Sequence, residues 1–408
     1  MFHLCTRILV SSFIANVWAQ SNELAAVRNV SSPLNQFSVR LLSETSDKAG
    51  DNINLALSPY TVWSLLSIIA EGAKDNTAQE LDKVLGLPSN KESFRRNYKS
   101  LTKYLQEKAD NVQLDINSAI FASKNQTLIR AYQTLVNNFY GVDIMPTDFK
   151  NVMQAVNSIN SYVAKSTQNK IVDLIKDVDV VNSEVLMVST LFFKGRWKLP
   201  FNDTATFSDK FYDESGNVKG SVSMMYQIGS YPYSFLANLK SHAVELPYGK
   251  GDRMSLIVIL PQKGEKLSSV LRQIVTVSFD YVLNTLETAE QQFGEDYVQV
   301  YLPRFSINSE LNLNEILHQM GIKDVFDPYE ANLLGIFHHY LFISRVIQQA
   351  RIEVNEEGTV ASAAAAGSLQ NRIPPPKFNA NKSFAYFIVD KPTRSILFCG
   401  KVTNPNNL

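Results

Sequence analysis

The residue types that catalyse reactions or bind metals form no recognisable constellation in this sequence. His338 and His339 are neighbours, and paired imidazoles can ligate a metal ion or move protons. No second paired cluster accompanies them, so surface or packing roles fit these histidines better. The motifs Gly-x-Ser-x-Gly, His-Glu-x-x-His and Gly-x-Gly-x-x-Gly are absent, and there is no cysteine-rich metal spacing. We therefore expect a protein that is not an enzyme, binds no metal and requires no cofactor.

One segment, residues 356–368, contains no large side chain, which is unusual because globular cores rarely use so many residues without burying one. Arg372 and Ile373 follow it closely, and then three prolines, Pro374 to Pro376. An exposed alanine-rich helix or a flexible spacer is the simplest alternative, since alanine is the best helix former. The first members of the segment are Glu356, Glu357, Gly358, Thr359, Val360, Ala361, Ser362, Ala363, Ala364, Ala365 and Ala366.

The rest of the chain predicts one mixed α+β unit that would have to hold this segment. Residues 20–32 are polar, and we expect them to be loose. Apolar residues at helical spacing predict helices over residues 34–42, 59–69, 77–85, 93–108, 151–165 and 313–320. Apolar or alternating runs predict strands over residues 114–121, 185–193, 254–260, 298–302, 343–353, 384–389 and 395–402.

Composition limits the partners and the compartment. The 408 residues include 39 Lys+Arg and 39 Asp+Glu, so no overall charge attracts the chain to nucleic acid or to a membrane. Residues 1–19 have the pattern of a secretory signal: His3 and Arg7 precede a short apolar run, Ile8 to Ile14, and Val17-Trp18-Ala19 offers a cleavage site. A buried N-terminal strand or helix is the alternative. Cleavage would leave residues 20–408 as one extracellular domain whose only cysteine, Cys399, we expect to be buried and inert.

A series of motifs resembles the serpin family over nearly the whole mature chain. The run Glu356-Glu357-Gly358-Thr359-x-Ala361-x-Ala363-Ala364 resembles the hinge that precedes the reactive loop of serpins. The other matching motifs are, in chain order, Asn54-x-x-x-Ser58-Pro59, Ile159-Asn160-x-Tyr162-Val163, Phe192-Phe193-Lys194-Gly195-x-Trp197, Glu245-Leu246-Pro247-Tyr248, Leu302-Pro303-Arg304-Phe305 and Phe398-x-Gly400-Lys401-Val402-x-Asn404-Pro405. The resemblance implies the serpin fold: a large mixed or antiparallel central sheet, further β-sheets, surrounding helices and an exposed reactive-centre loop at about residues 356–378.

The resemblance also implies a mechanism, in which a protease cuts the loop and the freed arm enters the central sheet as a new strand. Counted from the hinge, Arg372 is the bait side chain and Ile373 follows the cut bond. A guanidinium pairs bidentately with a carboxylate, which trypsin-like proteases hold in their specificity pocket. We expect a monomer that traps such a protease covalently. A non-inhibitory serpin that carries a small ligand is the alternative.

The resemblance assigns further residues to the two regions where the sheet must open. Trp197 and Arg304 match the region where the loop enters the sheet, and Arg304 would pair there with Glu356. Ser58, Ser189 and Gln348 match the region that ties the central strands together. Ser189 and Gln348 depart from the residues that are usual in the family, and we expect them to form a substitute pair, because each can donate and accept hydrogen bonds.

Two surface features remain. Four Asn-x-Ser/Thr sequons are candidate glycan sites, at Asn29, Asn125, Asn202 and Asn381. Basic residues recur along one predicted helix that binds heparin in some serpins, and a sulfated polyanion such as a glycosaminoglycan could bridge such a row. A solvated basic face opposite the apolar stripe is the alternative, and we favour it. The row consists of Arg95, Arg96, Lys99 and Lys103.

Overall fold

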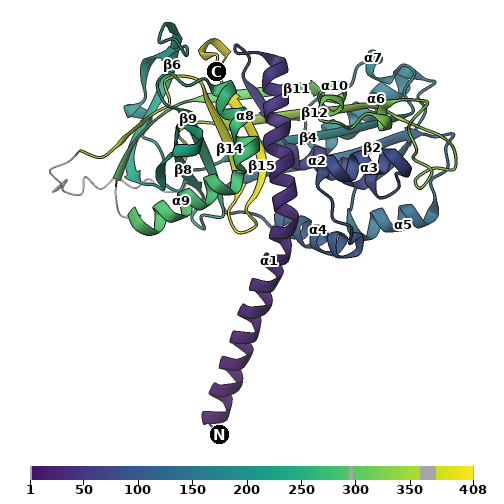
Figure 1. Cartoon of the computed structure of the whole chain (residues 1–408), viewed down its shortest axis with the longest axis horizontal. Helices are drawn as coiled ribbons and strands as arrows, with labels where there is room; N and C mark the ends of the chain where they lie inside the picture. The colour runs from purple at the N-terminus through teal and green to yellow at the C-terminus, as the bar shows by residue number, and fades with distance from the viewer. Residues whose placement is uncertain (1, 294–296, 359–373, 408) are drawn as a thin grey trace.

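The computed structural model describes residues 2–293, 297–358 and 374–407, with side chains described from residue 24 onward except those of residues 293 and 407. Within these ranges the strands form three sheets that pack against helices, so the predicted α+β class is confirmed (Figure 1). In this part of the chain, no helix has both the length and the apolar character needed to cross a membrane.

The five-stranded sheet is the element that the expected loop would have to enter. Its strand order is β11-β12-β4-β2-β3. The pairs β11–β12 and β2–β4 are antiparallel, whereas β12–β4 and β2–β3 are parallel. Its strands are β11 (Phe305–Asn312), β12 (Ile343–Val354), β4 (Val185–Gly195), β2 (Val112–Ser123) and β3 (Asp143–Thr147).

Of the other two sheets, the four-stranded one takes up the chain after the reactive segment through β13. The six-stranded sheet is antiparallel throughout and contains β1 (Leu55–Leu57), β15 (Ser395–Val402), β14 (Phe384–Asp390), β9 (Met254–Pro261), β8 (Ser241–Tyr248) and β7 (Tyr233–Leu236), in this order. The four-stranded sheet contains β13 (Lys377–Asn379), β10 (Tyr297–Pro303), β6 (Val218–Ser230) and β5 (Phe207–Tyr212).

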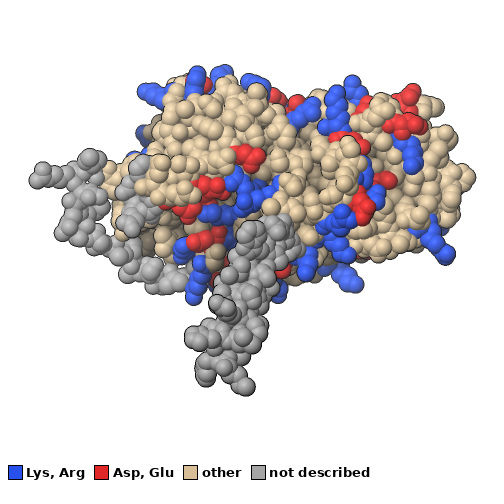
Figure 2. Space-filling model, turned by 60° about the horizontal axis from the view of Figure 1, so that its bottom comes forward, with Lys and Arg blue, Asp and Glu red and all other residues tan. Residues whose placement is uncertain are grey.

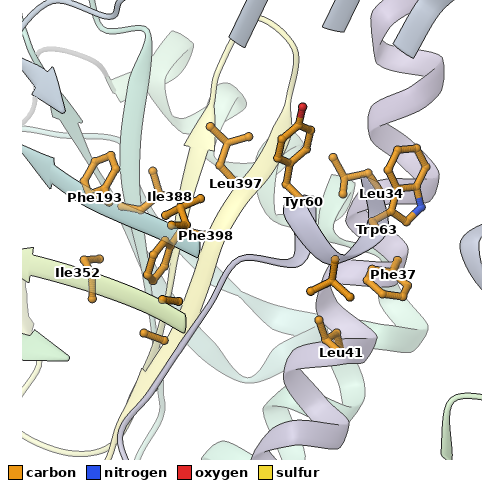
Figure 3. Close-up of a cluster of buried hydrophobic side chains, with 14 of the residues drawn as sticks. Leu34, Phe37, Leu41, Tyr60, Trp63, Phe193, Ile352, Ile388, Leu397 and Phe398 are labelled. Carbon is orange, nitrogen blue, oxygen red and sulfur yellow. The ribbon is translucent and has the colours of Figure 1, made fainter. Parts of the chain in front are cut away.

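The main core lies between the five-stranded sheet, the six-stranded sheet and the first helices (Figure 3). Phe193 of β4 and Ile352 of β12 face the side of β14 and β15, and Trp63 closes the core against the N-terminal helix. Cys399 in β15 is fully buried, as predicted, and burial raises the pKa of its thiol well above the ordinary value. Closely packed apolar side chains make up most of this core and hold the sheets together.

Helices cover the sheets on both faces. Their bounds are α1 (Phe2–Ala49), α2 (Pro59–Ala70), α3 (Asp75–Leu85), α4 (Lys91–Gln106), α5 (Arg130–Phe139), α6 (Val152–Ser166), α7 (Asp177–Val180), α8 (Leu267–Val277), α9 (Phe279–Phe293) and α10 (Asn314–Gln319). Short 3₁₀ turns lie at Asp203–Ala205, Ala237–Leu239, Asp324–Phe326 and Pro405–Asn407. The α2 helix packs on the inner face of the five-stranded sheet, and α6 packs on its outer face.

One expectation about the N-terminal region was wrong. Residues 20–32 are not loose, because they lie inside the continuous helix α1. Val27 and Val30 are buried in the main core, and Ser31 Oγ lies 2.7 Å from the Oγ of Ser395, the first residue of β15. The tertiary contacts of a few apolar residues therefore outweigh the polar composition of this stretch.

Candidate functional site

The parallel pair β4–β12 forms a seam at the centre of the five-stranded sheet. The register runs from Ile343 opposite Val185 to Glu353 opposite Lys194. A strand that followed β12 after a tight turn would run antiparallel to both seam strands, and antiparallel pairing needs only a short connection. The seam is therefore the place in this sheet where the chain beyond β12 can add one strand without any change of topology.

A buried glutamine closes the inner face of the seam. Gln348 lies directly opposite Ser189, and its Nε2 donates to Ser189 Oγ at 3.2 Å, so the expected pair is present. This is the longest of four hydrogen bonds that the amide makes. Gln348 is completely buried, and the two hydrogens of its Nε2 are shared among three acceptors, so the whole amide is satisfied without access to water.

The stronger contacts of Gln348 go to the start of α2. The Ser58 backbone N–H donates to Gln348 Oε1 at 3.0 Å, while Nε2 donates to Ser58 O at 2.8 Å and to Thr61 Oγ1 at 2.9 Å. A backbone N–H can only donate, so the amide atom that faces the Ser58 N–H must be the oxygen Oε1. Thr61 was not among the residues assigned to this region from the sequence, so its part in this cluster was missed.

On the outer face of the same seam, several buried polar side-chain atoms lack hydrogen-bond partners among the described residues. Asn117 of β2, Thr190 of β4 and Gln349 of β12 stand opposite one another across the three strands. Asn117 Nδ2, Thr190 Oγ1 and Gln349 Oε1 are buried and have no hydrogen-bond partner among the described residues. A buried polar atom without a partner costs roughly 1–3 kcal/mol, so this row weakens the closed sheet where the strands would separate.

The hinge begins where β12 ends, and its first acidic residue is held by a bidentate ion pair. Arg304 Nε donates to Glu356 Oε2 at 2.9 Å, and Arg304 Nη2 lies 2.5 Å from Glu356 Oε1. Thr206 Oγ1 donates to the same carboxylate at 2.7 Å. The predicted Arg304–Glu356 contact is thus present, whereas no signal in the sequence pointed to Thr206.

The electrostatics at Glu356 favour its charged form. Burial alone would raise the pKa of this carboxyl, but the hydrogen bonds from Arg304 and Thr206 outweigh it and lower the pKa below its ordinary value of 4.5. The Glu356 side chain is only 5% exposed, while that of Arg304 is 50% exposed. Water therefore screens the pair from the arginine side, which limits its contribution to stability.

Trp197 fastens the hinge backbone. Its indole Nε1 donates to Asn355 O at 2.6 Å, and its backbone N–H donates to Glu357 O at 3.0 Å. The indole is buried and stacks on Tyr248 with 4.3 Å between ring centroids. The carbonyl of Glu356 accepts from the N–H of Phe201 at 3.2 Å, so three successive hinge carbonyls are held by one short segment after β4.

Two more contacts set the mouth of the seam. Gly358 forms a parallel bridge with Trp197, and a Cβ added at Gly358 would lie 2.2 Å from Pro200 Cβ, so only glycine fits there. Glu357 lies within 3.4 Å of Lys194 Nζ and 3.9 Å of Arg196 Nε. These two ion pairs at the end of β4 were not expected from the sequence.

Residues 359–373 lie outside the described residues. They include the expected reactive bond, Arg372–Ile373, and the later hinge residues Thr359, Val360, Ala361, Ser362, Ala363, Ala364, Ala365 and Ala366. On its far side the chain is held again, because Gln299 donates its backbone N–H to Pro376 O at 2.9 Å and Lys377 to Asn379 pair in parallel with β10.

The basic row on α4 is interrupted by carboxylates. Arg95 makes a bidentate ion pair with Glu71 at 2.7 and 3.0 Å, and Arg96 pairs with Glu92 one turn away. Lys99 lies 5.9 Å above the ring of Phe139, and Lys103 is exposed. On the face shown in Figure 2, basic and acidic side chains likewise alternate. The four residues therefore do not form an uncompensated cationic stripe.

The remaining predicted positions lie at the surface. Asn29, Asn125 and Asn202 are exposed, and Asn381 is half-buried. His338 and His339 are exposed too. Among the residues that the structure describes, no three histidine, cysteine or carboxylate side chains are grouped to hold a metal ion.

The Gln348 cluster predicts a clear loss of stability when its amide is removed. Gln348→Ala leaves the Ser58 N–H buried without a partner, and we expect the free energy of unfolding to fall by roughly 1–3 kcal/mol. Thermal unfolding followed by circular dichroism measures the change. Gln113→Ala, at an exposed glutamine of β2, is the control; equal melting of the Gln348 variant and the control would show that the cluster contributes nothing.

Thr190 follows Ser189 in β4, and its hydroxyl has no partner among the described residues, so we expect its removal to increase stability. Thr190→Val replaces this hydroxyl by a methyl group of similar size, and we expect the midpoint of thermal unfolding to rise. The control is Thr393→Val, which removes an equally buried hydroxyl that is hydrogen-bonded to Asp390 at 2.6 Å and should lower the midpoint. A loss of stability in both variants would contradict this account of the outer row.

The lowered pKa of Glu356 predicts a pH-dependent contribution. Its folded-state pKa lies below the unfolded value, so the ionised form stabilises the fold above about pH 4.5, and this stabilisation disappears as the pH falls through the folded pKa. The difference in melting midpoint between the wild type and Glu356→Gln should therefore be constant near neutrality and shrink below pH 4.5. Glu330→Gln, at an exposed glutamate, is the control. A difference between the wild type and Glu356→Gln that does not change with pH would count against the Arg304–Glu356 pairing.

Comparisons with known proteins agree with this geometry. The family model described as serpin (serine protease inhibitor) matches residues 32–405. Leukocyte elastase inhibitor A of Mus musculus is 30% identical in an alignment of 371 residues that covers 89% of this chain and 96% of that protein. Antithrombin-III of Homo sapiens is 32% identical in an alignment of 383 residues that covers 91% of this chain and 80% of that protein.

A solved structure shows the same fold. The crystal structure of Manduca sexta serpin-12 superimposes with a TM-score of 0.79 and 26% sequence identity, covering 92% of this chain and 99% of that one. The match of the family model to nearly the whole chain, together with these relatives, identifies the family. The chain belongs to the serpin (serine protease inhibitor) family.

Proposed function

We propose that this serpin inhibits trypsin-like serine proteases as a suicide substrate. The protease cuts the bond between Arg372 and Ile373, and the freed arm enters the seam between β4 and β12. The observation that carries the proposal is the position of the hinge: Gly358, the last residue described before the arm, is bridged to Trp197 just beyond the end of β4. The arm is therefore attached at the mouth of the parallel pair that it would fill.

The residues of the arm suit insertion. Thr359, Ala361, Ala363 and Ala365 would alternate onto one face of an inserted strand, and all are small enough to pass between existing strands. No proline lies between Gly358 and Arg372, so every backbone N–H can join the ladder. The extended arm spans roughly 14 steps of about 3.4 Å, or about 48 Å, which is long enough to move an attached protease across a whole domain.

The chemistry is that of the protease, and the inhibitor halts it midway. The protease serine oxygen attacks the carbonyl carbon of Arg372, the C–N bond to Ile373 breaks, and the amine leaves with a proton. The product is an ester between the serine and Arg372. Insertion of the arm then carries this ester away from the reactive loop, and distortion of the protease keeps water from completing hydrolysis.

The bait residue supports a trypsin-like target. Several curated relatives are named elastase inhibitors, and the specificity of a relative does not transfer to this chain. Here the side chain at the cut is a guanidinium, which needs a carboxylate at the bottom of the protease pocket. The three prolines that follow favour an extended backbone on the leaving-group side and keep the bond exposed.

We also propose that the chain is secreted, with residues 1–19 as its signal and with glycans on the sequons. Three of the four sequon asparagines are exposed, which supports this route. No cofactor is required for the trapping reaction. A glycosaminoglycan remains an optional accelerator, and the ion pairs of Arg95 and Arg96 argue against a strong site on α4.

The bait assignment predicts the outcome of one substitution. Arg372→Ala should abolish the covalent complex with trypsin on a denaturing gel, because the variant no longer offers a side chain that fits the pocket. Lys377→Ala, at the next basic residue along the chain, is the matched control and should still form the complex. Trapping by Arg372→Ala would place the reactive bond elsewhere, and cleavage of the wild type without trapping would favour a carrier.

Testing several proteases for covalent complex formation separates the question of which protease is inhibited from the question of how it is trapped. We expect the wild type to form the complex with trypsin and not with an elastase. A complex with the elastase alone would overturn the trypsin-like assignment while leaving the trapping mechanism in place.

A further inference from the structure

The described chain resumes at Pro374, two residues after Arg372, with three prolines in a row. Pro374, Pro375 and Pro376 have no backbone N–H, so this stretch can be fastened to a sheet only through its carbonyl oxygens. The donors must come from the strand beside it, and the strand that pairs with the following segment, β13, is β10 of the four-stranded sheet. The contacts of the proline carbonyls with β10 therefore decide how the downstream side of the expected reactive bond is held.

One residue of β10 binds two successive proline carbonyls. The backbone N–H of Gln299 donates to Pro376 O at 2.9 Å, and its side-chain Nε2 donates to Pro375 O at 3.2 Å. A carbonyl oxygen can only accept, so the amide atom that faces Pro375 must be the nitrogen. We call these two hydrogen bonds the clamp.

The clamp is carried by a strand that is itself firmly held. Along its whole length β10 pairs antiparallel with β6, and on its other side it pairs with β13. The neighbours of Gln299 in the chain, Val298 and Val300, are buried in the main core, while Gln299 is half-buried. The clamp therefore fixes the prolines relative to the body of the protein.

The sequence between the reactive bond and the clamp is short and stiff. A proline ring fixes its own φ near −65°, and the residue before a proline is restricted to extended conformations. Ile373, Pro374 and Pro375 each precede a proline. In a polyproline conformation the three steps from Ile373 to Pro376 span about 9 Å. Two contacts at one end of so short and stiff a segment restrict the direction of its other end.

We propose that Gln299 is a positioning residue, which orients the bond Arg372–Ile373 through the clamp and sets the rate at which a protease first cuts it. This inference rests on the proposed function, since it concerns the same bond. A bond that is already restricted in orientation loses less conformational entropy when a protease binds it, so productive binding is faster.

The position of the clamp also predicts which step it leaves unchanged. Gln299 holds Pro375 and Pro376, which belong to the fragment that leaves when the bond breaks. The ester to the protease is formed on Arg372, which belongs to the other fragment. The loss of the clamp should therefore slow the first cut, and it should not change the fraction of cut chains that remain attached to the protease.

The test measures how fast trypsin cuts the intact full-length protein after Arg372. Denaturing gels count the covalent complex and the cut chain together, at an ionic strength high enough to screen added charges. Gln299→Met keeps the length of the side chain but removes the donor, and we expect it to be cut about two- to five-fold more slowly, as the loss of one half-buried hydrogen bond implies. The fraction trapped should stay at the wild-type value.

Three further variants separate orientation of the bond from general loosening. Gln227→Met, at a half-buried glutamine of β6 in the same sheet, is the matched control and should be cut at the wild-type rate. Gln299→Lys supplies a donor again and should recover most of that rate. Pro374→Gly loosens the stiff segment, so adding Gln299→Met to it should slow the cut no further than Pro374→Gly alone.

The possible results distinguish the clamp from the proposed function. Cutting of Gln299→Met at the wild-type rate, or equal slowing by Gln227→Met, would overturn the role of Gln299 and leave the proposed function intact. An undiminished effect of Gln299→Met in the Pro374→Gly background would overturn it as well. If the wild type is cut after Arg372 without any trapping, the proposed function fails, while the cutting rates still decide on the clamp. If trypsin does not cut there at all, both fall.

Discussion

The parallel pairing of β4 with β12 is the constraint on which the rest of the structure depends. Two parallel neighbours at the centre of a sheet leave room for one antiparallel strand between them, provided that their ladder can be broken. The inner face of this ladder is tied by Gln348 to the start of α2, while its outer face carries buried polar atoms without partners. The closed sheet therefore has a well-defined structure, but it leaves several buried polar atoms without hydrogen bonds to any described residue.

The hinge lies at the end of this parallel pair of strands. Glu356, Glu357 and Gly358 stand at the end of β12, and the segment after β4 holds their backbone through Trp197 and Phe201. Both seam strands thus end at the point where the arm departs. Beyond the reactive segment, β13 is paired with β10 in another sheet, so an uncut arm is fastened at both ends. Cutting the chain releases one of these ends and leaves the other at the mouth of the seam.

Much of this could be predicted from the sequence because some signals are local. Runs rich in apolar residues located β4 and β12 to within two residues, and the Arg304–Glu356 and Gln348–Ser189 contacts followed from the resemblance. The helices α8 and α9 were missed although Leu267, Val270, Leu271 and Ile274 have helical spacing. Partners distant in sequence had no signal: Glu71 neutralises Arg95, Thr206 binds Glu356, and Val27 and Val30 make a polar stretch helical.

The central claim is that the severed arm becomes a strand of the five-stranded sheet, and heat resistance measures this most directly. Limited proteolysis that cuts the chain once between residues 367 and 373 gives a two-fragment protein for comparison with the intact one. If the arm inserts, the added ladder stabilises the sheet, and the cut protein should unfold at a clearly higher temperature than the intact protein. A cut protein that unfolds at the same or a lower temperature would contradict the account.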